Sequence, residues 1–214
     1  MEVTNTDKVK DISYLDDDGA LQLSTTQQLA IKTLQERFEQ RLERSKQLNL
    51  PDKLGKSELM YFCKQRNKHR PHDSTTQPSI MINGTVIQPS KIIKHLGVYL
   101  DETLTFHVHT DDAAARGDKC LMSLTSLWHN GRGLLVLLST YTALHLVRAA
   151  FLLKMFWVSP VWWTGSQYII HHLELVYHRA LCWASGLPVY ISIRKLLLLT
   201  RSPPLRCLLN YLSG

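Results

Sequence analysis

Short alternating runs of apolar and polar residues dominate the first half of the chain and predict β-strands. Residues Val9–Tyr14 form the first run, and Ile12 and Tyr14 fall on one face of the expected strand because side chains alternate with a period of two. The sequence Asp16-Asp17-Asp18-Gly19 follows, and aspartate and glycine are typical turn residues. We therefore expect a strand that ends in an acidic turn.

A longer period marks the next segment as an amphipathic helix. Thr25 or Thr26 can cap its amino end, and the pattern continues to about Gln47. Apolar residues recur at spacings of three and four and form one stripe: Ile31, Leu34, Phe38 and Leu42. The opposite face is rich in lysine, arginine and glutamate. We expect the apolar stripe of this helix to pack on a sheet and its charged face to lie in solvent.

Further β-rich runs follow the helix. Ser57–Cys63 contains consecutive large apolar residues and is predicted to be a strand. The runs Ile80–Ile82 and Thr85–Ile87 are separated by Asn83-Gly84, a dipeptide that favours the tight turn of a β-hairpin. His95–Leu100 is predicted to be the last strand.

The second half of the chain has helical periodicity. We predict helices over about Thr110–Trp128, Ser139–Trp157, Tyr168–Ala184 and Ser192–Leu199. Large aromatic residues at helical spacing usually belong to a core, and we expect this of Trp157, Trp162, Trp163 and Trp183. The predicted fold is α+β, with a boundary near Leu104 between an α+β part, residues 1–104, and an all-helical part, residues 105–214.

Charge and cysteine content narrow the class of protein. The net charge is +7 and the pI about 9.3, which favours polyanionic partners such as nucleic acid or an anionic lipid surface. The four cysteines are scattered, with no CxxC pair to bind zinc and no disulfide framework. The amino-terminal residues are polar and mixed in charge, unlike a secretion signal. We expect a protein of the nucleus or cytoplasm that is not secreted.

One apolar segment raises the alternative of a membrane protein. Leu134–Trp163 is rich in leucine, valine, phenylalanine and tryptophan. It also contains His145, Arg148 and Lys154, each of which is unfavourable near the centre of a bilayer, and Pro160 interrupts it. We therefore favour a buried helix over a transmembrane one. Fractionation without detergent would separate this interpretation from a membrane-associated helical protein.

Adjacent carboxylates give the predicted acidic turn a candidate chemistry. Two-metal phosphoryl transfer requires carboxylates that hold two divalent ions about 4 Å apart. A tight turn in Tyr14-Leu15-Asp16-Asp17 would hold Asp16 and Asp17 rigidly, and their oxygen ligands suit Mg²⁺. An acidic turn with a purely structural role explains the same four residues equally well.

A basic loop is the second candidate. Its cations lie between two predicted strands: Lys64, Arg66, Lys68 and Arg70. Such a cluster can pair with phosphates. The loop contains no aromatic residue that could stack on bases, and an exposed solubilising loop is an equally good interpretation.

Histidines at the start of the helical half have the side chains of a metal site. His107 and His109 precede Asp111 and Asp112. A His-x-His pair needs a strand to place both rings on one side, whereas a helix is predicted to begin here. We therefore do not favour a metal site at these residues.

The order of the sequence blocks resembles the reverse transcriptases of non-LTR (LINE-like) retrotransposons, over nearly the whole chain. Tyr14-Leu15-Asp16-Asp17 looks like the catalytic turn of the palm in that family. Lys56-Ser57-Glu58, followed by apolar residues, looks like the next block. The stretch from Lys94 to Asp101, Lys-His-Leu-Gly-Val-Tyr-Leu-Asp, is similar to the hairpin that grips the primer terminus. Three later segments of this chain resemble the part of the family that follows the thumb: Arg179-Ala180-Leu181, Gly186-Leu187-Pro188 and Arg194-Lys195-Leu196-Leu197.

The resemblance implies roles for individual residues. Asp16 and Asp17 would be catalytic ligands of Mg²⁺, and Lys56 matches a lysine that protonates the leaving pyrophosphate. The tripeptide Leu96-Gly97-Val98 would lie under the primer backbone, so that the partners would be an RNA template and a DNA primer. Lys56 could equally be a solvated lysine at a strand edge, and Gly97 could mark a β-bulge.

The chain also departs from the family. The first catalytic aspartate of the family precedes the Tyr-Leu-Asp-Asp turn, on a strand that these residues do not include. Without that bridging ligand the metal pair should be poorly positioned. We expect a truncated fragment that is inactive by itself, with the carboxy-terminal part of the palm in residues 1–104 and a thumb-like helical region in residues 105–214. The alternative is a helical nucleic-acid-binding or protein-interaction module without catalysis, and the oligomeric state is not indicated.

Overall fold

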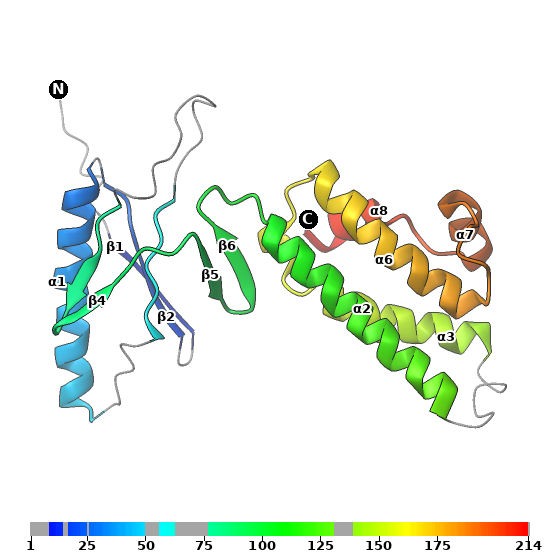
Figure 1. The fold of residues 1–214 in the computed structure, drawn as a ribbon, viewed down its shortest axis with the longest axis horizontal. Helices are drawn as coiled ribbons and strands as arrows, with labels where there is room; N and C mark the ends of the chain where they lie inside the picture. The colour runs from blue at the N-terminus through cyan, green and yellow to red at the C-terminus, as the bar shows by residue number, and fades with distance from the viewer. Residues whose placement is uncertain are drawn as a thin grey trace. The chain divides into compact units, whose positions relative to one another are not determined.

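The computed structural model describes residues 9–14, 17–24, 26–49, 56–62, 77–130 and 139–213. Its secondary structure is α+β, as predicted (Figure 1). The chain divides into two compact units, Met1–Thr105 and Phe106–Gly214, so the division lies one residue beyond the boundary expected near Leu104. The strands belong to the first unit, and the second unit is helical in its described part.

The acidic segment lies in an antiparallel hairpin. Strand β1 (Val9–Tyr14) is confirmed, and it pairs with β2 (Asp17–Gln22) so that Tyr14 lies opposite Asp17. The predicted turn was placed too late, because Asp17, Asp18 and Gly19 already belong to β2. Cross-strand pairing satisfies the backbone of these residues, which their turn-forming composition alone did not predict.

The long amphipathic helix is confirmed as α1 (Gln27–Gln47). The Thr26 hydroxyl oxygen accepts a hydrogen bond from the backbone N–H of Leu29 and caps the amino end. The predicted apolar stripe packs into a small core with residues from later in the chain. The members of this core are Ile31, Leu34, Phe38, Leu42, Leu59, Tyr61, Ile80, Ile82 and Ile87.

Two tight hairpins follow. Strands β3 (Ile80–Ile82) and β4 (Thr85–Ile87) confirm the hairpin predicted from Asn83-Gly84, whose φ angles are 47° and 76°. Positive φ at both turn residues matches the right-handed twist of the strands, and asparagine and glycine tolerate it best.

The last predicted strand was wrong. His95–Leu100 is split into β5 (Ile92–His95) and β6 (Val98–Asp101), which pair with each other in an antiparallel hairpin. Leu96 and Gly97 form the turn, with φ angles of 49° and 81°. Leucine is unfavourable in this conformation, which is why local sequence preferences concealed the turn.

The other predicted strand, Ser57–Cys63, is also wrong within its described residues. Leu59 alone makes an isolated bridge to Pro89, and its carbonyl accepts a hydrogen bond from the backbone N–H of Ser90 at 2.8 Å. Cys63 lies outside the described residues. The described strands form three separate two-stranded sheets rather than one palm-like sheet.

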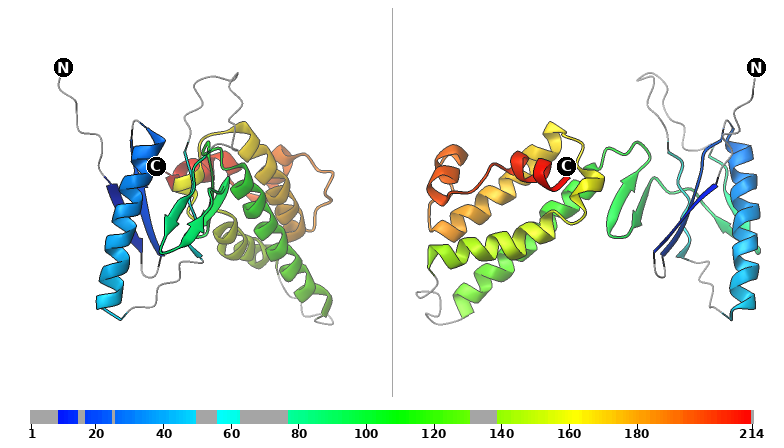
Figure 2. Two further views of the ribbon diagram at one scale, coloured as in Figure 1. Left: turned by 60° about the vertical axis from the view of Figure 1, so that its left-hand side comes forward. Right: turned by 180° about the vertical axis from the view of Figure 1, so that it is seen from behind.

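The second unit is built from helices of unequal length (Figure 2). The predicted helices are present, with shifted ends and with a π-helical turn, η4, that interrupts the second one. Short helices around prolines were not predicted. The described helical elements are α2 (His107–Asn130), α3 (Thr140–Leu146), η4 (Val147–Phe151), α4 (Leu152–Met155), α5 (Ser159–Trp162), α6 (Gln167–Ser185), α7 (Ile193–Thr200) and α8 (Leu205–Ser213).

Close packing of α2 on α6 organises the helical core. Gly117 of α2 lies where a β-carbon would be 3.1 Å from the Phe151 ring and 3.1 Å from a methyl group of Val176, so a glycine permits this approach. Leu173 of α6 and Phe151 are fully buried, at 0% exposure. Helices α2 and α6 lie side by side in Figures 1 and 2, with α3 packed against α6.

The tryptophan prediction was only partly right. Trp162 is fully buried, and its ring N–H donates a hydrogen bond to the Trp157 carbonyl at 2.8 Å. Trp157 itself is 54% exposed, whereas Trp163 and Trp183 are half-buried. Helical spacing alone could not distinguish these positions, because the chain leaves helical geometry between α4 and α5, where Val158 has a φ of 53°.

The apolar segment that raised the membrane alternative is broken into short pieces. Between Ser139 and Trp163 the chain forms α3, η4, α4 and α5 rather than one straight helix. In the part of the chain that the structure describes, none of the helices combines the length and apolar character needed to cross a bilayer.

Candidate functional site

The acidic turn is described in part. Leu15 and Asp16 lie outside the described residues, whereas the backbone of Asp17 begins β2 opposite Tyr14. The backbone of Tyr14 and Asp17 therefore lies at one end of the paired strands β1 and β2, and the carboxylate pair Asp16-Asp17 stays a prediction from the sequence. Among the described residues, no three His, Cys, Asp or Glu side chains converge on a common metal position.

Lys56 lies on the surface just before the Leu59 bridge. Its side chain is exposed, and within the described residues no hydrogen bond or ion pair of Lys56 is found. The side chains of Asp16 and Asp17 lie outside the described residues, so the structure does not test a contact of Lys56 with them. The solvated lysine and the proton donor therefore both stay open as interpretations of this residue.

The predicted basic loop lies outside the described residues, and with it Lys64, Arg66, Lys68 and Arg70. Their interpretation as phosphate ligands stays a prediction from the sequence.

The predicted primer contact is a well-defined hairpin tip. Leu96 and Gly97 occupy the turn between β5 and β6, and the Leu96 side chain is 37% exposed. Val98 is only 4% exposed, so its side chain anchors the hairpin and cannot meet a ligand. A glycine with φ of 81° leaves the backbone of the tip open to close approach by another chain.

One face of this hairpin carries residues that the sequence analysis did not select. Lys94 lies opposite Tyr99 in the β5–β6 register, and its ammonium group is 4.7 Å from the centre of the Tyr99 ring. This cation–π contact places a charge and an aromatic ring side by side, the two groups that bind phosphate and stack on a base. Lys91 is exposed just before β5. No local pattern signals the Lys94–Tyr99 pair, because it depends on the β5–β6 register, which the single strand predicted over His95–Leu100 does not contain.

Asp101 ends the hairpin and organises the turn that follows it. One carboxylate oxygen accepts hydrogen bonds from the backbone N–H groups of Thr103 and Thr105, at 3.1 and 3.0 Å. The hydroxyl groups of the same threonines also donate to Asp101. These bonds give Asp101 a structural role as the organiser of a tight turn.

The basic excess of the chain lies in the helical unit. Residues 106–214 contain 10 lysines and arginines against 4 aspartates and glutamates, a net +6 of the total +7. Three of these four acids lie on α2, and only Glu174 lies elsewhere. Polyanions would therefore be attracted mainly to this unit.

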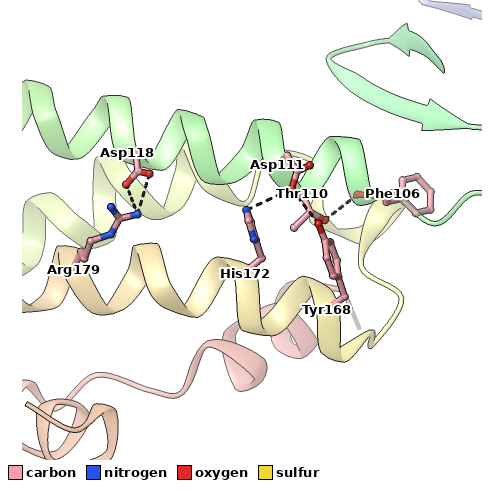
Figure 3. Close-up of polar contacts among 7 residues, drawn as sticks. All are labelled: Phe106, Thr110, Asp111, Asp118, Tyr168, His172 and Arg179. Atoms are coloured by element: carbon pink, nitrogen blue, oxygen red, sulfur yellow. Dashed lines mark hydrogen bonds and ion pairs between the residues drawn. The ribbon is translucent and has the colours of Figure 1, made fainter. Parts of the chain in front are cut away.

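Two of the three aspartates of α2, Asp111 and Asp118, form a polar edge with α6 (Figure 3). Asp111 accepts a hydrogen bond from the Tyr168 hydroxyl at 3.3 Å and lies 3.4 Å from Nε2 of His172. One heptad later, Asp118 pairs with Arg179 at 2.9 Å. The offset between partners is 61 residues in both pairs, 172 − 111 and 179 − 118, so the two helices run in the same direction. Partial burial and the nearby Asp111 carboxylate raise the pKa of Tyr168.

The two histidines of the His-x-His sequence have different neighbours. His107 packs on the Tyr168 ring with 4.1 Å between ring centres. His109 is fully buried with its ring centre 5.2 Å from that of Trp162. A helix begins at His107 and separates side chains two residues apart by about 200°, so the rings do not form one site.

A cysteine and a histidine meet on α6, but not as a catalytic pair. Sγ of Cys182 is 3.9 Å from Nε2 of His178. That nitrogen lies 2.8 Å from the Ile191 carbonyl, and the thiol donates to the Pro188 carbonyl. Burial raises the pKa of the Cys182 thiol, which opposes formation of a nucleophilic thiolate. The contacts of these two side chains hold the loop after α6 against that helix.

Comparisons with protein-family models, with curated proteins and with solved structures found no match to this chain.

Proposed function

We propose that this chain is a part of a reverse transcriptase of the non-LTR retrotransposon kind, an RNA-directed DNA polymerase. In this proposal Asp16 and Asp17 bind Mg²⁺, and the tip of the β5–β6 hairpin contacts the primer of an RNA–DNA duplex. The palm would correspond to the strand-containing unit and the thumb to the helical unit.

The observation that carries the proposal is the hairpin geometry of two separate sequence blocks. Tyr14 and Asp17 are paired across β1 and β2, and Leu96-Gly97 forms the two-residue turn between β5 and β6. Each block resembles a family element that must be a hairpin to work, the first to hold carboxylates and the second to approach a nucleic-acid backbone. The Lys94–Tyr99 pair adds a charge and a stacking ring to the second hairpin.

These 214 residues are not expected to polymerise DNA by themselves. Two adjacent carboxylates can bind a divalent ion, but a two-metal site needs a further bridging carboxylate that the resemblance assigns to another strand. The test is primer extension on an RNA template with Mg²⁺ and dNTPs, using the chain alone. No extension is expected, and processive synthesis by the unaltered chain would contradict this expectation. Synthesis that survives the D16N/D17N double variant would also contradict the assignment of these two aspartates.

Binding of the duplex can be tested without catalysis. The variant K91E/K94E should weaken binding of a labelled RNA–DNA primer–template about tenfold or more, because two phosphate contacts and the Lys94–Tyr99 pair are lost. The control K32E/K46E carries the same charge change on exposed residues of α1 and should bind almost as well as the wild type. Equal losses in both variants would assign the effect to net charge rather than to the hairpin.

A second candidate function is a helical module that binds nucleic acid without catalysis. The concentration of the positive charge, +6 of +7, in residues 106–214 favours it. In that case K91E/K94E should have no effect on binding, whereas R148E/R206E in the helical unit should reduce it. The salt dependence of the Kd should fall in the same variant, since fewer counterions are released.

A further inference from the structure

The solvent face of α7 combines two exposed leucines with two cations. Leu198 and Leu199 are 79% and 65% exposed. Arg194 and Lys195 precede them by four residues and are also exposed. Residues four apart lie above one another on a helix, so the four side chains form one continuous stripe. We call these four residues the α7 stripe.

The α7 stripe belongs to a helix that is fixed in place (α7 in Figure 1). On the opposite side, Leu196 is fully buried and Thr200 is 5% exposed. The helix ends at Thr200 and is capped by Arg201, whose φ is 49°, and the backbone N–H of Ser202 donates to the Leu197 carbonyl at 3.0 Å. The exposed leucines therefore stand on a packed and capped helix, and they do not result from fraying.

Apolar residues continue just before the helix. Val189 is 67% exposed and Tyr190 is 89% exposed. The loop that carries them is held to α6 by the contact of 2.8 Å between His178 and the Ile191 carbonyl. Large apolar side chains that gather on the surface, rather than occurring singly, are typical of interaction sites.

The charge around the α7 stripe favours an acidic partner. Glu174 is the only acid in residues 139–213, against seven lysines and arginines. Within the described residues, Arg194 and Lys195 make no hydrogen bond or ion pair through their side chains, whereas Arg179 is paired with Asp118. A partner would therefore have to supply both the negative charges and the apolar surface.

We infer that the α7 stripe docks an acidic amphipathic helix of another protein. A helix with leucine-like residues at spacings of three and four would cover Leu198 and Leu199. Glutamates or aspartates one turn away would pair with Arg194 and Lys195. Phosphates alone would leave both leucines exposed, and two leucines on a helix of eight residues offer little area for insertion into a bilayer. This inference is independent of the proposed polymerase ancestry.

The experiment measures binding of the full chain to designed peptides by fluorescence anisotropy. The probe is a labelled peptide of about 18 residues, five helical turns, with one leucine stripe flanked by glutamates. A second peptide has lysine in place of every glutamate, and a third has glutamine in place of every leucine. The acidic leucine peptide should bind in a saturable manner, and the other two should bind at least about tenfold more weakly.

Variants on the α7 stripe test both parts of the surface. L198Q/L199Q should weaken binding of the acidic peptide about tenfold, and R194E/K195E should transfer the preference to the lysine peptide. The controls are L153Q, at a leucine that is 70% exposed on α4, and K154E/R206E, with the same charge change as R194E/K195E. Both controls should bind like the wild type. Circular dichroism checks that each variant is folded.

Several outcomes would overturn the inference. Binding that depends on Arg194 and Lys195 but not on the leucines, and that single-stranded RNA competes away, would indicate a phosphate surface. Co-sedimentation with phosphatidylserine vesicles that is lost in L198Q/L199Q would indicate a lipid surface. A dimer that the same variant dissociates would indicate a second copy of the chain. No saturable binding of the acidic peptide would leave the α7 stripe without the proposed partner.

Discussion

Different interactions stabilise the folds of the two units of the chain. In the described part of residues 1–105, structure comes from hairpins with two-residue turns and from one helix on a small core, whose most buried member is Ile82 at 2% exposure. In residues 106–214, many side chains are fully buried, among them Phe151, Trp162 and Leu173 at 0%. The first unit therefore relies on local turn geometry, and the second on close packing of helices.

This difference explains where candidate functional residues occur. The Leu96-Gly97 tip is defined by its own two-residue turn, with Leu96 37% exposed, so it can present functional groups without a large core beneath it. The helical unit instead carries its candidate surface on the outside of a packed helix, at the α7 stripe. Substitutions in the cores, at glycines, at tyrosines and in ion pairs should therefore change the stability of the two units to different extents.

The largest effect should come from the cores. Leu173→Ala should lower the free energy of unfolding of the helical unit by about 3–5 kcal/mol, because a fully buried side chain leaves a cavity in close-packed helices. Ile82→Ala should cost about 2–3 kcal/mol in the first unit, whose smaller core can relax. Chemical denaturation, monitored by amide hydrogen exchange in each unit, measures both losses of unfolding free energy. If either variant lowers the protection of both units equally, they unfold together and the comparison fails.

Glycines should matter for different reasons in the two units. Gly117→Val should destabilise the helical unit by about 2–3 kcal/mol, because the added atoms meet Phe151 and Val176. The control Ala115→Val, at an exposed position of the same helix, should cost only about 0.5 kcal/mol. Thermal unfolding of the two variants measures the difference.

Gly84→Ala should act through the backbone instead. A β-carbon at Gly84 meets nothing within 4 Å, but its φ is 76°, where alanine is strained by about 1–2 kcal/mol. Gly84→Asn should restore much of this loss, since asparagine tolerates positive φ. Equal destabilisation by alanine and asparagine would show that space, not conformation, selects glycine at this turn.

A tyrosine in each unit links stability to alkaline pH. The Tyr177 hydroxyl donates to the Pro203 carbonyl and the Tyr61 hydroxyl donates to the Pro78 carbonyl. Burial raises the pKa of both side chains above the usual 10.0. Their contribution to stability is therefore complete below about pH 10 and is lost as the pH rises through the folded-state pKa.

Replacing these tyrosines measures the linkage. Tyr177→Phe should cost about 1 kcal/mol at neutral pH through the lost hydrogen bond. Between about pH 9 and 11 its Tm should fall less than that of the wild type, because no buried hydroxyl ionises. The effect of Tyr61→Phe should be smaller, since Tyr61 is only half-buried. Parallel Tm curves for wild type and Tyr177→Phe would argue against this linkage.

The smallest effect should come from the polar edge between α2 and α6. Asp118→Asn should cost less than about 1 kcal/mol, because the side chains of Asp118 and Arg179 are 33% and 49% exposed and water screens the pair. High salt should remove most of the difference from the wild type. A loss of several kcal/mol in urea unfolding would mean that this edge, rather than the buried core, holds the helices together.

The sequence by itself determined the features that depend on neighbouring residues. It placed α1 with a cap at Thr25 or Thr26, the Asn83-Gly84 hairpin and a change to helices near Leu104, since periodicity and turn chemistry act over a few residues. It also selected the acidic segment and the Leu96-Gly97-Val98 block as candidate functional residues.

Only the tertiary structure decided the features that depend on distant contacts. The predicted strand His95–Leu100 is instead a hairpin with leucine in an unfavourable turn conformation, followed by the buried Val98. Packing after Val158 buried Trp162 and exposed Trp157, and the burial of Leu196 turned Leu198 and Leu199 to solvent. The physical reason is that burial is shared among residues far apart in sequence, so the local pattern shows which side chains can be buried but not which ones are.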